Sequence, residues 1–338
     1  MNDPAASKAT RPLTLRRLGV HVGVMAAATI AVALLCSIFG EVELTSGIWR
    51  ARLLRLLAAG TVGAALATAG MALQGLLRNP LAEPYVLGIS SGAGVGVLVG
   101  LALAPAVALP SWATTPGLAL IGAAATCAVV YGIAQSRGRL DPYVLLLSGV
   151  IVNAFNGAVM LGVFLVAPKQ TITNFTVWAM GGVSERIAIT NVPFLLLCGA
   201  AVLGGWALLF VRGAAYNALG LGDDVARSTG VSVGRLRIET FLVAAMLTAA
   251  AVALAGPIGF VGLIVPHVCR LVVGPDHRRL AIASGFAGAS LLMAADTLCR
   301  LAGGWLRIGE VPVGIVTALA GGPFFIYLLR SRFREGRA

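Results

Sequence analysis

The sequence predicts an all-α integral membrane protein with about ten transmembrane helices. Of its 338 residues, 58% are hydrophobic and only 11% are charged, and the mean hydropathy is +0.92. Soluble domains carry about 25% charged residues, so this composition excludes an ordinary soluble fold. Apolar runs of about 20 residues, the length that crosses a bilayer as a helix, recur along the whole chain.

The apolar runs define ten expected spans. Their approximate bounds are 18–39, 56–77, 85–104, 117–135, 143–166, 192–211, 239–257, 258–273, 280–302 and 312–329. The eighth run is short and is interrupted by Pro266, which lacks a backbone N–H. The first run is longer than the apolar region of about 7–15 residues in a signal peptide, so we expect a retained first span.

Basic residues set the expected orientation. The chain has 25 Lys and Arg residues against 13 Asp and Glu, a net charge of +12. With ten spans, most of these basic residues fall on the side of the two basic termini, and the positive-inside rule makes that side the cytoplasm. We therefore expect a cytoplasmic tail at 1–17, a ten-span domain at 18–330 and a second cytoplasmic tail at 331–338. Basic residues placed between spans in this way argue against nucleic-acid binding.

A dense polar segment at residues 74–92 separates the second span from the third. It contains Gln74, Arg78, Asn79, Glu83, Pro80 and Pro84. Each proline disfavours helix in the residue before it, so the chain must turn here. The turn is either an ordinary loop or part of the functional machinery. Gly92, Gly96 and Gly100 then follow at a spacing that allows close helix packing.

Two connecting segments are longer than a simple connector needs. The outer segment, 168–193, is expected to form a short helix at the outer mouth. The inner segment, 212–237, has Asp223 and Asp224 where acids favour a helix N-terminus, and Gly230 where a C-terminal cap would lie. This pattern predicts a short cytoplasmic helix on which a soluble partner docks. A solvated loop that carries topology-setting arginines is the alternative.

A weak internal repeat is also present. Ala67, Ala69, Gly70, Pro80 and Gly88 recur at one constant offset as Ala253, Ala255, Gly256, Pro266 and Gly274. Since the second and seventh spans cross in opposite directions, this pattern is compatible with an inverted repeat, a common transporter architecture.

Two motifs that would indicate ATP hydrolysis or zinc-dependent catalysis are missing from the chain. Neither GxxxxGK[ST], the phosphate-binding loop, nor HExxH, a zinc-protease motif, occurs. We therefore expect no cofactor or metal on this chain, and any ATP to be hydrolysed by another one. An intramembrane enzyme would have to use His267 and Asp296. A structural histidine at a helix break and an ion pair between Asp296 and Arg300, four residues apart, are the leading interpretations.

Six segments together resemble the FecCD-type permeases of bacterial type II ABC importers. They are RLLR at 52–55, QGLLRNPLAEPYVLGISSGA at 74–93, ALGLGDDVARSTGV at 218–231, GPIGFVGLIVPHVCRLVVGPDHRR at 256–279, ADTLCR at 295–300 and EVPVGIVTALAGGPFF at 310–325. The resemblance covers nearly all of the chain after the N-terminal tail.

This resemblance implies a multi-pass permease subunit in the bacterial inner (plasma) membrane. The implied partners are a second permease copy or a close homologue, two ATPase subunits that bind ATP and Mg²⁺, and a periplasmic or lipid-anchored substrate-binding protein. The implied cargo is an iron chelate, a ferric siderophore or haem. Cobalamin is the alternative, because the run MGG at 180–182 is similar to cobalamin permeases.

The resemblance also assigns roles to single residues. It places Asn79 and Leu81 at the cytoplasmic gate, with Asp141 and Pro142 at a second gate element where the family often has small hydroxyl residues. It implies a coupling element at 219–231, in contact with the ATPase, which includes Leu219, Gly220, Asp223, Asp224, Ala226, Arg227 and Gly230. Arg52, Arg55 and Arg300 match outer arginines that receive acidic residues of the binding protein, although RLLR lacks the proline that the family commonly has there.

Overall fold

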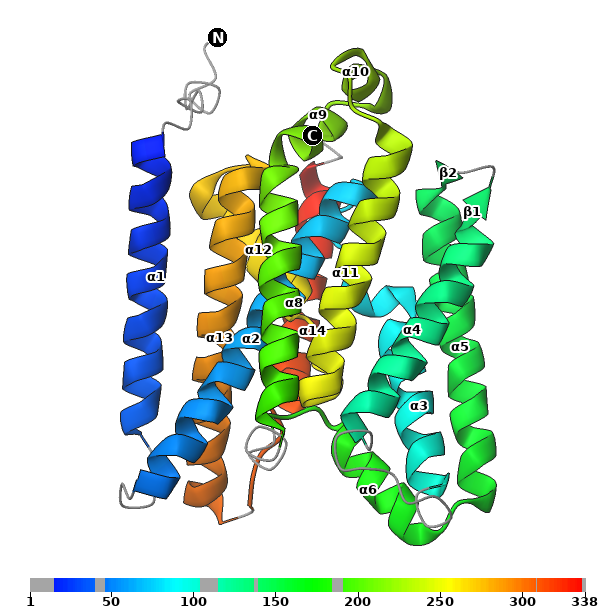
Figure 1. Ribbon diagram of the computed structural model, residues 1–338, viewed down its shortest axis with the longest axis vertical. Helices are drawn as coiled ribbons and strands as arrows, with labels where there is room; N and C mark the ends of the chain where they lie inside the picture. Colours follow the sequence, from blue (N-terminus) through cyan, green and yellow to red (C-terminus); the bar gives the residue numbers. More distant parts are fainter. Residues whose placement is uncertain are drawn as a thin grey trace.

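The computed structural model describes residues 15–39, 46–103, 115–136, 139–183, 191–307 and 309–335. Almost all of these residues are helical (Figure 1). The helices are α1 (Leu15–Ile38), α2 (Ser46–Leu77), the short 3-10 helix η1 (Pro84–Leu87), α3 (Ile89–Leu103), α4 (Thr115–Ala134), α5 (Pro142–Val166), α6 (Lys169–Ala179), α8 (Val192–Val211), α9 (Gly213–Gly220), α10 (Asp223–Ser228), α11 (Val233–Ala255), α12 (Val261–Val273), α13 (His277–Leu306) and α14 (Val313–Glu335). The strands β1 (Gln135–Ser136) and β2 (Arg139–Leu140) form a small antiparallel hairpin.

Every predicted span corresponds to a helix. Eight helices in the described part of the chain are long and apolar enough to cross a membrane, and α3 and α12 are shorter apolar helices. Helix α12 is short because it starts only after Phe260, whose φ of 68° ends the preceding extended segment, and it stops at Gly274. The predicted tails lie largely outside the described residues, which exclude 1–14 and 336–338.

Helix α2 differs most from its predicted bounds. The sequence predicts a span from residue 56, whereas α2 begins at Ser46 and carries Arg52 and Arg55 within the helix. Both arginines are buried. An arginine that the sequence analysis places in an outer loop therefore lies inside the helix bundle. It is stable there because acidic residues from distant segments pair with it.

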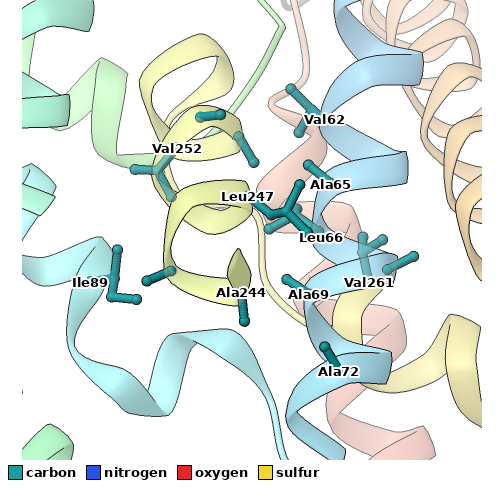
Figure 2. Close-up of a cluster of buried hydrophobic side chains, with 14 of the residues drawn as sticks. Val62, Ala65, Leu66, Ala69, Ala72, Ile89, Ala244, Leu247, Val252 and Val261 are labelled. Carbon is teal, nitrogen blue, oxygen red and sulfur yellow. The ribbon is translucent and has the colours of Figure 1, made fainter. Parts of the chain in front are cut away.

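Helix α2 forms the centre of the bundle and packs against α8, α11, α12 and α13. Figure 2 shows the small and branched side chains, such as Ala65, Leu66 and Ala69, that fill the space between α2, α11 and α12. The backbones touch where glycines face each other. A Cβ on Gly63 would lie 2.1 Å from the carbonyl oxygen of Gly288 in α13, and one on Gly70 would lie 1.8 Å from that of Gly262 in α12.

Helices α3 and α4 pack in the same manner, as the glycine spacing predicts. A Cβ on Gly92 would lie 2.0 Å from Oγ1 of Thr126, and one on Gly96 would lie 2.1 Å from the carbonyl oxygen of Leu118. Small residues allow this approach, which is typical of helix pairs in membranes. The inverted repeat stays a prediction.

The functional segments gather at the two ends of the bundle. Figure 1 places the start of α1, the end of α14, the hairpin and helices α9 and α10 at one end. The start of α2, the end of α13 and helix α6 lie at the other. Helix α6 confirms the predicted short helix in the 168–193 segment. Which end faces the cytoplasm stays a prediction of the charge pattern.

Candidate functional site

The turn between α2 and η1 is a closed, hydrogen-bonded unit. The backbone N–H of Asn79 donates to the carbonyl of Gln74 (3.2 Å), and its side-chain Oδ1 accepts from the N–H of Leu81 (3.0 Å). The N–H of Ala82 donates to the carbonyl of Asn79 (3.0 Å). An asparagine that bonds the backbone two residues ahead stabilises a tight turn. The predicted gate residues Asn79 and Leu81 therefore share one rigid turn, with Asn79 exposed and Leu81 half-buried.

The buried side of this turn is fastened to α12. A carboxylate oxygen of Glu83 accepts a hydrogen bond from the backbone N–H of Phe260. Gln74 donates to the carbonyl of Gly262 (3.4 Å) and accepts from Arg270 (3.2 Å). Burial raises the pKa of Glu83, and the Phe260 N–H opposes this shift in part. The carboxylate of Glu83 therefore points towards the start of α12 and fastens the turn there, instead of pointing into solvent.

The predicted coupling segment forms two short helices. Helix α10 confirms the helix expected near Asp223 and Asp224, and α9 precedes it. Gly222, at φ 132°, forms the corner between them, and Gly230, at φ 83°, ends the second. A side chain at either glycine would be strained. Of the remaining predicted coupling residues, Leu219 and Ala226 are buried, whereas Gly220, Asp224 and Arg227 are exposed.

Helix α9 is anchored to the neighbouring spans. Asn217 donates to the carboxylate of Asp276 (2.9 Å) and accepts from the backbone N–H of His277 (2.9 Å) at the start of α13. The Tyr216 ring stacks on the His277 ring, with centroids 5.6 Å apart, and its hydroxyl contacts Thr240 of α11 (2.5 Å). A force applied to α9 and α10 is therefore delivered to α11 and α13.

Asp223, at the first position of α10, links three elements. It forms an ion pair with Arg78 at the start of the turn, a second with Arg237 of α11 (2.9 Å) and a longer one with Arg227 of its own helix (3.8 Å). One carboxylate thus joins the turn, the short helix and a long spanning helix. Arg78 and Asp223 lie 145 positions apart, so the sequence alone does not pair them.

The second predicted gate element is the start of α5. Asp141 is its N-cap, and Oδ1 accepts hydrogen bonds from the N–H groups of Tyr143 (2.8 Å) and Val144 (3.0 Å). Pro142 occupies the first helical position, where proline is favoured. Aspartate, serine and threonine all cap helices in this way, so the departure from a small hydroxyl residue preserves the local structure.

The 3-10 helix η1 joins the two predicted gate elements. It packs against α5, where a Cβ on Gly149 would lie 2.4 Å from the carbonyl oxygen of Val86. The turn at Asn79 and the helix that begins after Asp141 are therefore connected through η1.

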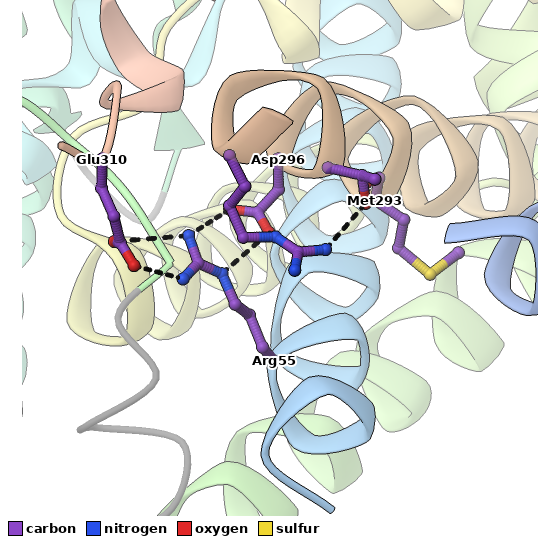
Figure 3. Close-up of polar contacts among 6 residues, drawn as sticks. Arg55, Met293, Asp296 and Glu310 are labelled. Atoms are coloured by element: carbon purple, nitrogen blue, oxygen red, sulfur yellow. Dashed lines mark hydrogen bonds and ion pairs between the residues drawn. The ribbon is translucent and has the colours of Figure 1, made fainter. Parts of the chain in front are cut away.

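Two of the predicted docking arginines, Arg55 and Arg300, meet at Asp296 between α2 and α13, and Figure 3 shows Arg55 between Asp296 and Glu310. Arg55 donates from Nε and Nη2 to the two carboxylate oxygens of Asp296 (2.9 and 3.0 Å) and from Nη1 to Glu310 (2.9 Å). Nε of Arg300 lies 3.5 Å from the same Asp296, and Arg52 lies in α2 one turn before Arg55. Arg55 and Asp296 are almost completely buried, whereas 67% of the Glu310 side chain is exposed.

This arrangement changes the interpretation of Asp296. The expected pair with Arg300 is present, but the bidentate partner is Arg55, which the sequence analysis did not connect to Asp296. A buried carboxylate must be paired with a cation, so the position of Asp296 within an apolar span already indicated that a cation lies close to it. Glu310 was also missed, because nothing in the sequence distinguishes it from other exposed acids.

A cavity of about 780 Å³ opens on the side of α3, α5 and α6. Its polar lining consists of neutral groups, among them Tyr85, Ser91 and Asn153, and its aromatic lining includes Phe164 and Trp178. No charged side chain lines this cavity within the described part of the chain. Across the same described residues, no three His, Cys, Asp or Glu side chains cluster in a way that could hold a metal ion.

Comparison with known proteins places these features in context. Residues 18–331 match the model of the FecCD transport family. The cobalamin import system permease protein BtuC of Halobacterium salinarum is 42% identical over 283 residues, 83% of this chain and 72% of that protein. The hemin transport system permease protein HmuU of Yersinia pestis is 38% identical over 292 residues, 85% of this chain and 84% of that protein.

A solved structure agrees with the fold. A metal-chelate type ABC transporter in an inward-facing conformation aligns with a TM-score of 0.79 and 27% identity, over 92% of this chain and 99% of the other.

Proposed function

The chain belongs to the FecCD transport family of ABC importer permeases, and we propose that the cargo it carries across the bacterial inner membrane is an iron chelate, either a ferric siderophore or haem. The chain is a transport component rather than an enzyme, and such permeases work with ATPase and substrate-binding partners. An intramembrane enzyme has no support: Asp296 is engaged by Arg55, and the ring of His267 packs edge-on against Phe324.

The observation that carries the cargo proposal is the cavity beside α3, α5 and α6. It is large, and its lining offers neutral hydrogen-bonding groups and aromatic rings rather than charges. Such a surface suits a bulky chelate whose metal is already wrapped by organic ligands. Cobalamin, also bulky and wrapped, is the second candidate, favoured by the similarity to the Halobacterium salinarum cobalamin permease.

The assembly that we propose contains two permease subunits around a central path. The outward face of α5 supports this arrangement, because Leu147, Ile151 and Phe155 are all exposed there and need a partner or lipid to cover them. The second subunit is another copy or a close homologue, and two ATPase subunits and one binding protein complete the complex.

Transport then proceeds by alternating access. The two ATPase subunits bind ATP and Mg²⁺ and press on α9 and α10, which we place on the cytoplasmic side. The gate consists of the turn at Asn79 and Leu81 and the start of α5 at Asp141 and Pro142. Support comes from geometry: both elements are stiffened by their own hydrogen bonds, so they move as units rather than deform.

The binding protein docks at the other end, on Arg52, Arg55 and Arg300. In the present structure the carboxylate of Glu310 forms an ion pair with Nη1 of Arg55. An acidic residue of the binding protein would therefore replace Glu310, and docking exchanges one carboxylate for another. Because Arg52 and Arg55 are buried, the incoming acid would reach Arg55 where Glu310 now opens to the surface. Charge complementarity across an interface mainly sets orientation and association rate.

Reconstitution tests the cargo directly. The permease, its ATPase and its binding protein are placed in liposomes, and ATPase activity is measured with ferric siderophores, haem and cobalamin in turn. We expect an iron chelate to stimulate hydrolysis and to accumulate inside the vesicles. Stimulation by cobalamin alone would replace the iron proposal with the second candidate, and no stimulation by any of them would refute both.

Coupling has its own test. Replacing Asp223 and Asp224 with asparagine in the same complex should leave ATP hydrolysis running while uptake falls. If the double variant transports normally with wild-type dependence on cargo, α10 is not the coupling element.

A further inference from the structure

We propose that Arg78 is a positioning residue which links the coupling helix to the gate: its ion pair with Asp223 carries the movement of α10 to the turn that holds Asn79 and Leu81. The inference rests on the proposed coupling role of α10 and the proposed gate role of the turn. It adds a specific connection between them.

The position of Arg78 suits this role. It is the first residue after α2 and has a left-handed backbone, φ 48°, which few non-glycine residues adopt. This conformation ends the helix and starts the turn, and the guanidinium group meets Asp223. An unusual backbone conformation persists only where its surroundings fix it, and such residues often lie at functional sites.

The connection between Arg78 and the gate residues is short and stiff. Asn79 follows directly, its side chain holds the N–H of Leu81 at 3.0 Å, and Pro80 between them has a fixed φ. The far end of the turn is fixed by Glu83 to the N–H of Phe260. A displacement of the Arg78 side chain is therefore transmitted to the turn instead of being absorbed by a flexible loop.

Asp223 is equally well placed on the other side. It begins α10, the helix that directly follows the corner at Gly222. Arg237 of α11 binds its other face, with Nη2 2.9 Å from Oδ2. The carboxylate is therefore held in position while it binds Arg78, and a shift of α10 relative to α11 must either move Arg78 or break the pair.

The pair contributes little to stability, which makes a clean test possible. The side chains of Arg78 and Asp223 are 39% and 25% exposed, and partly exposed ion pairs change folding only slightly. A control arginine lies at the same end of the bundle. Arg330, in the last part of α14, is exposed and belongs to neither the turn at 78–82 nor the 212–237 segment.

The experiment measures transport per ATP hydrolysed in the complete importer reconstituted in liposomes, with the cargo that stimulates the wild type. Arg78→Ala should lower this ratio about fivefold to tenfold, the lower part of the range for coupling between sites. Binding of the ATPase subunits and the thermal stability of the complex should stay at wild-type values. Arg330→Ala, which removes an arginine charge outside the gate and the coupling segment, should leave the ratio unchanged.

A double-mutant cycle identifies the partner. Asp223→Ala should lower the same ratio, and it also removes the ion pairs with Arg227 and Arg237. Adding Arg78→Ala to Asp223→Ala should cause no further loss, because Arg78 has then already lost this partner. Arg78→Lys, which keeps the charge, should recover part of the loss.

Three results would overturn the inference. They are a wild-type ratio in Arg78→Ala, multiplying losses in the double variant, and loss of ATPase binding in Arg78→Ala, which would make Arg78 a direct ATPase contact. Failure of the proposed function has a different signature, because the wild-type complex itself would then transport no cargo.

Discussion

Arg55 and Asp296 face each other across the interface of α2 and α13 in a bidentate ion pair, with Nε and Nη2 2.9 and 3.0 Å from the two carboxylate oxygens (Figure 3). Their positions in the sequence are 241 residues apart. Both side chains are withdrawn from solvent, and the exposed Glu310 connects Arg55 to the surface. The relationship accounts for an arginine inside α2 and an aspartate inside α13 at the same time.

Removing one member of this pair should destabilise the fold severely. Asp296→Ala removes the bidentate partner of a buried guanidinium and is expected to cost about 3–5 kcal/mol, the range for breaking buried pairs. Replacing both residues together, Arg55→Met with Asp296→Leu, should cost much less, because both almost fully buried charges are then gone and Glu310 is exposed to water. Thermal unfolding of the purified protein in detergent measures both. Equal losses in the single and double variants would contradict this account of the pair.

Releasing Arg55 from Glu310 should strengthen docking of the binding protein. Glu310→Gln removes a competing carboxylate but keeps the size of the side chain, so an incoming acid meets a less neutralised Arg55. Affinity for the binding protein should rise, and the rise should shrink as salt is added, since partly exposed charges are screened. Surface binding measurements at low and high salt test this. Weaker docking in Glu310→Gln would mean that Glu310 itself contacts the binding protein.

The cap of α5 should tolerate exchange among capping residues. Asp141→Ser keeps an oxygen that can accept from the N–H groups of Tyr143 and Val144 and is expected to preserve stability and uptake. Asp141→Ala removes the acceptor and should cost about 1 kcal/mol. The comparison separates capping from charge. If Asp141→Ser transports as poorly as Asp141→Ala, the negative charge has a role of its own in the gate.

Glu83 should make stability depend on pH in a defined direction. Burial raises its pKa above the ordinary value of 4.5, so the folded protein holds the proton more tightly than the unfolded chain does. Stability therefore falls as pH rises from the ordinary value towards the raised one, and stays lower above it. Glu83→Gln keeps an oxygen for the Phe260 N–H and carries no charge, so this part of the pH dependence should vanish. The free energy of unfolding of Glu83→Gln and of the wild type, measured across this pH range, tests the prediction.

The spans were predictable because length and apolarity are local properties of the sequence. Even the short helix α12 follows from its apolar run, and α10 follows from its acids and its terminal glycine. Local capping rules also explain the pairing of Asp141 with Pro142, which the resemblance alone made puzzling. Each of these features depends on residues within a few positions of each other.

Contacts between distant segments could not be predicted in this way. The start of α2 was misplaced because Arg55 looks like a loop residue when its partners, Asp296 and Glu310, lie in the other half of the chain. Arg78 could not be paired with Asp223 from the sequence for the same reason, because the two lie 145 positions apart. Pairing between charges is a property of the tertiary structure, and a single sequence does not record it.

The glycine contacts of α2 limit which parts of the permease can move. At Gly63 with Gly288 and Gly70 with Gly262, backbone packs directly against backbone, because the glycines carry no side chain that would keep the helices apart. Sliding of α2 along α12 or α13 would break these close contacts. We therefore expect the three helices to move as one unit, and the proposed moving elements, the turn at Asn79, α5 and the α9–α10 pair, to change position relative to it.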